Sequence, residues 1–242
     1  MATLDSWSVG EHTHAGVTHP TYRKGHGPGV IVISEIPGIT PKVVEFAEEV
    51  VAAGFTVVMP QLFGRPGGAN GTLPVLRTLG FICVSRELSL LARGETQPVA
   101  DWLRSLARAL HEELGGPGVG AIGMCFTGGF ALAMMVDPAV VAPVLAQPSA
   151  PIAVTPKRSA DLNLSPADLA VVKERAAAGC PVLGLRYRSD PMVGRRFGTL
   201  TREIGDAFIR VEFEGRQHAT LTEHRQQEGV DRVLAFLAER LA

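Results

Sequence analysis

Short apolar runs recur along the chain at intervals that suit strands separated by helices. Most of these runs are continuous rather than strictly alternating, which is typical of parallel strands covered on both faces of a sheet. Segments with apolar residues at helical spacing lie between most of the runs, which predicts right-handed crossovers and parallel pairing. The predicted strands are GVIVIS (29–34), GFTVVMP (54–60), GVGAIGM (118–124), APVLAQ (142–147), CPVLGLRY (180–187) and AFIRVEFEG (207–215). The predicted helices are residues 41–53, 96–114, 126–136, 166–178, 195–205 and 223–241.

The ends of the elements follow from the same pattern. In the first predicted helix, TPKVVEFAEEVVAAGF, the apolar residues return at helical spacing until Gly54 ends the helix. Residues 2–24 predict an antiparallel pair at the edge of the sheet, and the glycine-rich stretch 60–74 predicts a long loop of the kind that borders sites. Because the sequence has no internal repeat and no linker, we expect one α/β domain over residues 1–242. Its mostly parallel central sheet should carry helices on both faces.

Composition narrows the class of protein. A chain of 242 residues with 46% hydrophobic residues can form a substantial core, which excludes a disordered chain. The net charge of −1 predicts no binding to nucleic acid or to a membrane surface. The three cysteines have no paired spacing, and the first residues lack the pattern of a secretory signal. No apolar run is long enough to span a membrane. These features favour a cytoplasmic protein. The oligomeric state is left open.

One stretch, GVGAIGMCFTGGFALAM (118–134), carries candidate chemistry. It predicts a strand, a tight corner and a helix, with Cys125 at the corner. The G-x-S-x-G pattern of a nucleophile elbow is altered twice, because cysteine replaces serine and the second glycine comes one position late, at Gly128. A corner of this kind tolerates only small neighbours, and a helix N-terminus favours a thiolate. The alternative is a buried cysteine in a glycine-rich packing turn.

Four reactive residues come just after predicted strands: Glu35, Cys125, Asp190 and His218. Since ligands of open α/β sheets bind beyond the carboxyl ends of the strands, we expect these side chains to lie together. The chain order nucleophile, acid, histidine is that of α/β-hydrolases. We predict that His218 takes the Cys125 proton and later protonates the leaving oxygen, while Asp190 orients the imidazole. Taken singly, Asp190 also fits an ordinary turn and His218 an ordinary loop.

Two further features belong to this predicted site. Glu35 follows an apolar run, so its carboxyl group should be partly buried, which is costly without a partner. The oxyanion of the reaction is expected to bind the backbone N–H groups of Phe126 and Ile36. Pro37 cannot serve, because proline has no N–H group.

Together these pieces resemble the dienelactone hydrolase family. The segments that carry the resemblance are SEIPGIT, PQLFGR, GMCFTGG, SDPMV and GRQHAT, which run in family order within residues 29–241. The resemblance implies an α/β-hydrolase fold without a large cap and a Cys125–His218–Asp190 triad. It also implies that Glu35 contacts the resting thiol and helps to deprotonate it when substrate arrives. No metal and no organic cofactor are implied.

The substrate is where this chain departs from the family. Members that hydrolyse dienelactone carry an arginine a few residues after the histidine, where this chain has Ala-Thr-Leu-Thr at 219–222. A second family arginine comes from the segment after the glycine-rich loop, and Arg77 or Arg86 can match it. We take Arg86 as the candidate substrate-binding residue, and Arg216, two residues before His218, as another arginine able to take over that role. Without the first arginine, we expect a weaker preference for carboxylate-bearing lactones.

The leading hypothesis is a cysteine-dependent hydrolase of small carboxylic esters or lactones, which forms an acyl-enzyme on Cys125. One alternative is a hydrolase or acyl transferase that acts on another acyl compound, such as a thioester. A second alternative is a non-catalytic binding protein on the same fold. Labelling by an electrophilic ester would separate catalytic from silent proteins.

Overall fold

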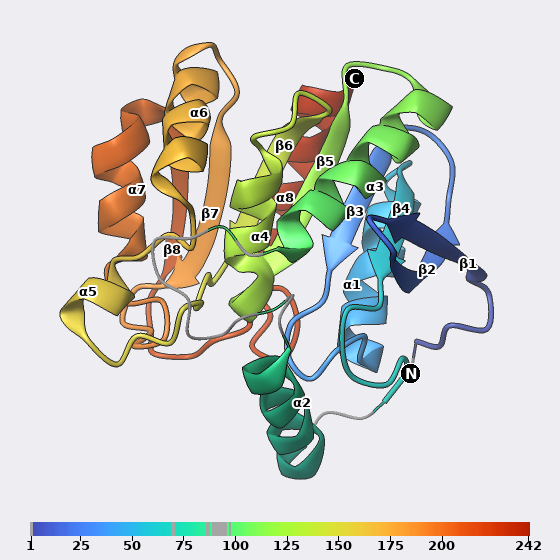
Figure 1. Ribbon diagram of the computed structural model, residues 1–242, viewed down its shortest axis with the longest axis horizontal. Coiled ribbons are helices and arrows are strands. Elements are labelled where there is room, and N and C mark those ends of the chain that lie inside the picture. Colours follow the sequence, from blue (N-terminus) through green and yellow to red (C-terminus); the bar gives the residue numbers. More distant parts are fainter. Residues whose placement is uncertain (1, 69–70, 86–87, 89–95, 97) are drawn as a thin grey trace.

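A computed structural model describes residues 2–68, 71–85, 88, 96 and 98–242, without the side chains of residues 82–84. Within this part of the chain, eight strands form one sheet in the order β1-β2-β4-β3-β5-β6-β7-β8 (Figure 1). The strands are β1 (Ser8–His14), β2 (Val17–Lys24), β3 (Gly29–Ile33), β4 (Thr56–Pro60), β5 (Val119–Met124), β6 (Val140–Ala146), β7 (Val182–Tyr187) and β8 (Phe208–Phe213). All pairs from β4 to β8 are parallel, whereas β1–β2 and β2–β4 are antiparallel. The predicted mostly parallel sheet and the predicted edge pair are both confirmed.

Helices cover both faces of the sheet, as predicted (Figure 1). They are α1 (Pro41–Ala52), α2 (Thr72–Val84), α3 (Val99–Leu114), α4 (Gly128–Met134), α5 (Pro156–Ser159), α6 (Pro166–Ala177), α7 (Arg196–Ile204) and α8 (Gln227–Leu241). Side chains of successive strand residues point to opposite faces. In β3, Ile31 and Ile33 therefore join one buried core with α3, α4 and α7, and Val30 and Val32 join the other with α1 and α8. Burial on both faces explains why the central strands read as continuous apolar runs.

Two helices differ from the sequence prediction. The loop predicted over residues 60–74 is shorter in the structure, because α2 begins within it at Thr72. This helix lies beyond the carboxyl ends of the strands (Figure 1). It is docked there by the Thr78 hydroxyl, which donates to the Pro37 carbonyl at 3.1 Å. The single-turn helix α5 was also not predicted. None of the helices among the described residues is long and apolar enough to cross a membrane.

Candidate active site

The corner between β5 and α4 has the strained geometry of a nucleophile elbow. Cys125 has φ +56°, in the left-handed region that residues other than glycine rarely adopt. A Cβ atom on Gly123 would lie 2.2 Å from the Thr127 carbonyl oxygen, and one on Gly128 would lie 2.8 Å from Pro148 Cα. Glycine is therefore required at position 128, because the segment at Pro148 approaches it closely. This close approach accounts for the second glycine coming one position late.

Thr127, at the position where the strict pattern has glycine, fixes the elbow to the neighbouring strand. It is fully buried, and its hydroxyl accepts from the Met124 N–H at 2.9 Å. The same hydroxyl lies 3.0 Å from the Ile33 carbonyl oxygen, at the end of β3. Thr127 thereby joins the end of β5 to the end of β3, the strand that precedes Glu35.

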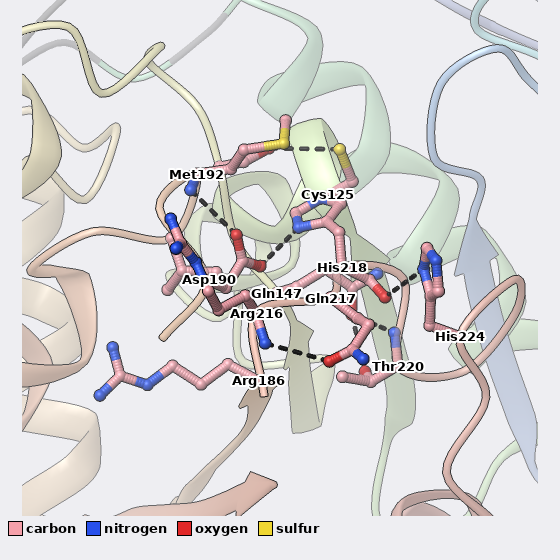
Figure 2. A network of polar contacts seen from close by, with 12 residues as sticks. Cys125, Gln147, Arg186, Asp190, Met192, Arg216, Gln217, His218, Thr220 and His224 are labelled. Carbon is pink, nitrogen blue, oxygen red and sulfur yellow. Dashed lines mark hydrogen bonds and ion pairs between the residues drawn. The ribbon is translucent and has the colours of Figure 1, made fainter. Parts of the chain in front are cut away.

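The structure brings the predicted acid and histidine together (Figure 2). Asp190 follows β7 and His218 follows β8, and the His218 Nδ1 and Asp190 Oδ2 atoms are 2.6 Å apart. The other carboxylate oxygen of Asp190 accepts from the Met192 N–H at 2.9 Å, so both oxygens of the buried carboxylate are hydrogen-bonded. A short charge-assisted hydrogen bond of this kind fixes the orientation of the imidazole ring.

The charge state of His218 is set by these neighbours. Burial lowers the pKa of His218, but the hydrogen bond to Asp190 and the nearby Cys125 sulfur outweigh it and raise this pKa to about 10. Among the described residues, the buried Nε2 atom makes no hydrogen bond that meets strict geometric criteria, yet hydrogen bonding and charge at Cys125 both raise the pKa of the ring. Asp190 therefore orients the imidazole through Nδ1, and Cys125 interacts with the same ring.

The hydrogen bonds of Glu35 go to neutral side chains rather than to the thiol. Glu35 is buried; its Oε2 accepts from Gln147 Nε2 at 3.2 Å, and its Oε1 is hydrogen-bonded to the Thr222 hydroxyl. Burial raises the pKa of Glu35, and these hydrogen bonds and His218 only partly oppose the rise. The contact with the resting thiol that the family resemblance implies is thus not a hydrogen bond in this structure. Thr222, within the segment that lacks the family arginine, binds Glu35 instead.

The Cys125 sulfur contacts a residue that sequence reasoning missed. Cys125 Sγ lies 3.2 Å from Ser149 Oγ. Gln147, two residues earlier, was missed as well; its Oε1 accepts from the Thr220 N–H at 3.1 Å and from the Thr220 hydroxyl at 2.7 Å. Both residues follow β6, the strand next to β5. Their position at that strand end is the signal that was available, but neutral side chains there do not stand out as reactive groups.

The candidate substrate-binding arginines differ in whether they line a cavity. A cavity of about 370 Å³ lies between α2 and the loops after β3 and β4, and its lining includes Pro37, Gly38, Arg65, Arg77, Thr78 and Phe81. Pro37 and Gly38, in the turn that follows Glu35, belong to this lining. Arg77 therefore faces this cavity, whereas Arg86 lies outside the described residues. Arg216 is exposed.

The predicted oxyanion donors lie on the two segments that flank the elbow. Phe126 is the residue after Cys125 in the short 3₁₀ turn Cys125–Thr127, and it is buried. Ile36 is the residue after Glu35, in the turn that follows β3, the strand that pairs with β5. Their N–H groups remain the predicted donors to an oxyanion.

Comparison with known proteins places this arrangement in a family. The model of the dienelactone hydrolase family matches residues 14–229. The chain belongs to that family. A comparison with curated protein sequences finds no match. The family match confirms the resemblance seen in the sequence. Membership of this family supports a hydrolase that acts on small molecules.

Solved structures show how widely this fold is used. A dienelactone hydrolase from Anabaena variabilis superposes with a TM-score of 0.65 at 14% identity, covering 98% of this chain and 99% of that one. A dienelactone hydrolase-like promiscuous phosphotriesterase from metagenomic libraries has a TM-score of 0.65 at 17% identity, covering 98% and 99%. A thioesterase domain from the curacin biosynthetic pathway has a TM-score of 0.58 at 12% identity, covering 97% and 100%. At these identities the likeness shows the fold alone.

Proposed function

We propose that this protein hydrolyses small carboxylic esters or lactones through an acyl-enzyme on Cys125. The observation that carries the proposal is the Asp190–His218 pair, whose Nδ1 and Oδ2 atoms are 2.6 Å apart and whose imidazole interacts with a cysteine held at φ +56°. Asp190 fixes the imidazole so that one nitrogen remains available to the nucleophile, which is the arrangement that general-base activation needs.

The proposed reaction has two halves. His218 Nε2 holds the proton of Cys125, and the sulfur attacks the carbonyl carbon to form a C–S bond while the carbonyl oxygen becomes an oxyanion. The Ile36 and Phe126 N–H groups donate to that oxyanion. The C–O bond then breaks, and the leaving oxygen takes the proton from His218. Water, deprotonated by His218, attacks the thioester and releases the acid, and the proton returns to the sulfur.

Replacement of the nucleophile tests this proposal. Cys125→Ala should abolish turnover of a panel of small esters and lactones, with a loss on the order of 10⁶ in rate. Cys180→Ala is the matched control, because Cys180 is a buried core cysteine whose thiol pKa is raised by burial. It should keep near-normal turnover. An alanine variant at 125 that kept more than a few per cent of the activity would refute the proposal.

The panel should separate acyl hydrolysis from other chemistries. A thioester and a phosphotriester should be included, because two structurally similar proteins are named as a thioesterase and a phosphotriesterase. Trapping of a labelled acyl group on Cys125, located by peptide mapping, would support the acyl-enzyme. A protein with no turnover and no label, although folded, would instead fit the binding-protein alternative.

The substrate class follows from the charges near the site. We propose that uncharged esters compete well with carboxylate-bearing lactones, since Thr222 and its neighbours supply no arginine. The test is kcat/KM for a dienelactone and for an uncharged ester of similar size. A preference of several hundredfold for the charged lactone would contradict this. Arg86→Ala, Arg77→Ala and Arg216→Ala would then show which arginine binds the carboxylate.

A further inference from the structure

The segment after β6 meets the proposed nucleophile through two hydrogen bonds. Ser149 Oγ lies 3.2 Å from Cys125 Sγ, and the Ser149 N–H donates to the Cys125 carbonyl at 3.0 Å. Ser149 is buried, with 7% of its surface exposed. The hydroxyl is therefore held against the sulfur by the backbone of the same two residues, and water has little access to it.

The direction of the side-chain hydrogen bond follows from what the hydroxyl can reach. A buried hydroxyl whose proton is not donated costs free energy, so the proton must find an acceptor. Among the described residues, Cys125 Sγ is the atom that Ser149 Oγ contacts within hydrogen-bond distance. The sulfur is therefore the acceptor available to the Ser149 O–H group within this part of the chain. An anionic sulfur accepts such a bond much more strongly than a neutral one.

The segment that carries Ser149 is fixed from the other side by a buried arginine. Arg196 is 1% exposed, and its guanidinium donates to the Ala150 carbonyl at 3.1 Å and to the Met192 carbonyl at 2.9 Å. It thus ties the residue after Ser149 to the turn that holds Asp190. Arg196 consequently connects the segment of Ser149 with the segment of Asp190 through hydrogen bonds.

We infer that Ser149 is a further catalytic residue, whose hydroxyl donates a hydrogen bond to Cys125 Sγ and stabilises the thiolate. The inference rests on the proposed cysteine chemistry. When the thiolate forms, the Cys125 proton moves to His218 Nε2, and Ser149 keeps its own proton and forms no covalent bond. Attack on the substrate removes the charge from the sulfur, so the hydrogen bond is strong in the thiolate state and weak in the thioester.

Alkylation of Cys125 by iodoacetamide, followed by mass mapping across a pH range, tests this role without any substrate. Ser149→Ala removes the donor, and a hydrogen bond to a charged group is worth about tenfold or more in equilibrium constant. The pH of half-maximal alkylation should therefore move upward by about one unit or more. Ser149→Thr keeps the hydroxyl and should restore most of the shift. Ser189→Ala, at an exposed serine beside Asp190, should leave the midpoint unchanged.

Three titratable groups near Cys125 must be considered when a shift of the alkylation midpoint is assigned to Ser149. His218 interacts with Cys125 and Asp190, and Glu35 interacts with His218. Ser149→Ala leaves all of them in place. A midpoint that stays the same or moves downward in Ser149→Ala would overturn the inference, since it would mean that the hydroxyl accepts from a neutral thiol or does not matter. Turnover by Cys125→Ala decides the proposed function separately, because alkylation reports on the thiolate alone.

Discussion

Gln147 links three separate parts of the candidate site, and removing its amide should loosen all of them. The side chain is fully buried. Its Nε2 donates to Glu35, after β3, while its Oε1 accepts from the N–H and the hydroxyl of Thr220, two residues beyond His218. Because the Thr220 N–H must be a donor, the orientation of the amide is fixed, and Nε2 must face Glu35. Gln147→Leu keeps a similar volume and deletes every one of these hydrogen bonds.

The expected loss of stability follows from the groups left unpaired. The Thr220 N–H and hydroxyl would be two buried donors without an acceptor, each costing ~1–3 kcal/mol, or ~2–6 kcal/mol together. Burial of the leucine offsets up to ~2 kcal/mol of that penalty. With a central penalty of ~4 kcal/mol and an offset of ~2 kcal/mol, we expect the free energy of unfolding to fall by about 2 kcal/mol. Turnover should fall as well, since the loop that carries His218 loses the two hydrogen bonds that Thr220 makes to Gln147.

Urea unfolding followed by tryptophan fluorescence measures this, because Trp7 and Trp102 are both buried. Gln217→Leu is the matched control. Gln217 is exposed, and its Oε1 accepts only from the N–H of the adjacent Arg216, at 3.0 Å, within the described structure. That variant should stay within ~0.5 kcal/mol of the wild type. If Gln147→Leu were no less stable than Gln217→Leu, the reasoning from buried hydrogen bonds would be refuted.

Three further predictions concern titratable groups. Glu35→Gln should fold normally, because burial already raises the pKa of Glu35 toward the neutral form, but should lose much of its turnover if the carboxylate acts as a base; an unchanged kcat with a higher melting temperature would show only a dispensable buried acid. The folded-state pKa of His218, about 10, lies above the value of an unfolded histidine, so the stability it contributes is fully present below about pH 6.5 and is lost as the pH rises toward 10. Unfolding free energies at pH 6 and pH 9.5 should therefore differ more in the wild type than in His218→Gln, and equal differences would contradict the assignment. Iodoacetamide should modify Cys125 before Cys180, whose thiol pKa is raised by burial, and peptide maps with Cys180 labelled first would count against the site.

The hydrophobic pattern was enough to predict the sheet, because strands buried on both faces must be apolar throughout. Residues 29–34 and 118–124 were predicted in this way and form β3 and β5. The pattern did not predict α2, whose sequence contains Pro74 and Gly80 and lacks a polar face. That helix forms where Thr78 can bond to the turn after β3, which is a contact between segments far apart in the chain.

In the candidate site, too, some residues were predicted from the sequence and others are evident only from tertiary contacts. Cys125, Asp190 and His218 were found from the sequence, because reactive side chains at the ends of parallel strands must gather at one edge of the sheet. Ser149, Gln147 and Thr222 were not, because neutral hydrogen-bonding residues have no distinctive pattern, and their partners come from other strands. Which polar group meets the sulfur, and which holds Glu35, depends on distances of about 3 Å between chain segments. A linear sequence determines which residues reach that edge, and only tertiary packing determines which atoms touch there.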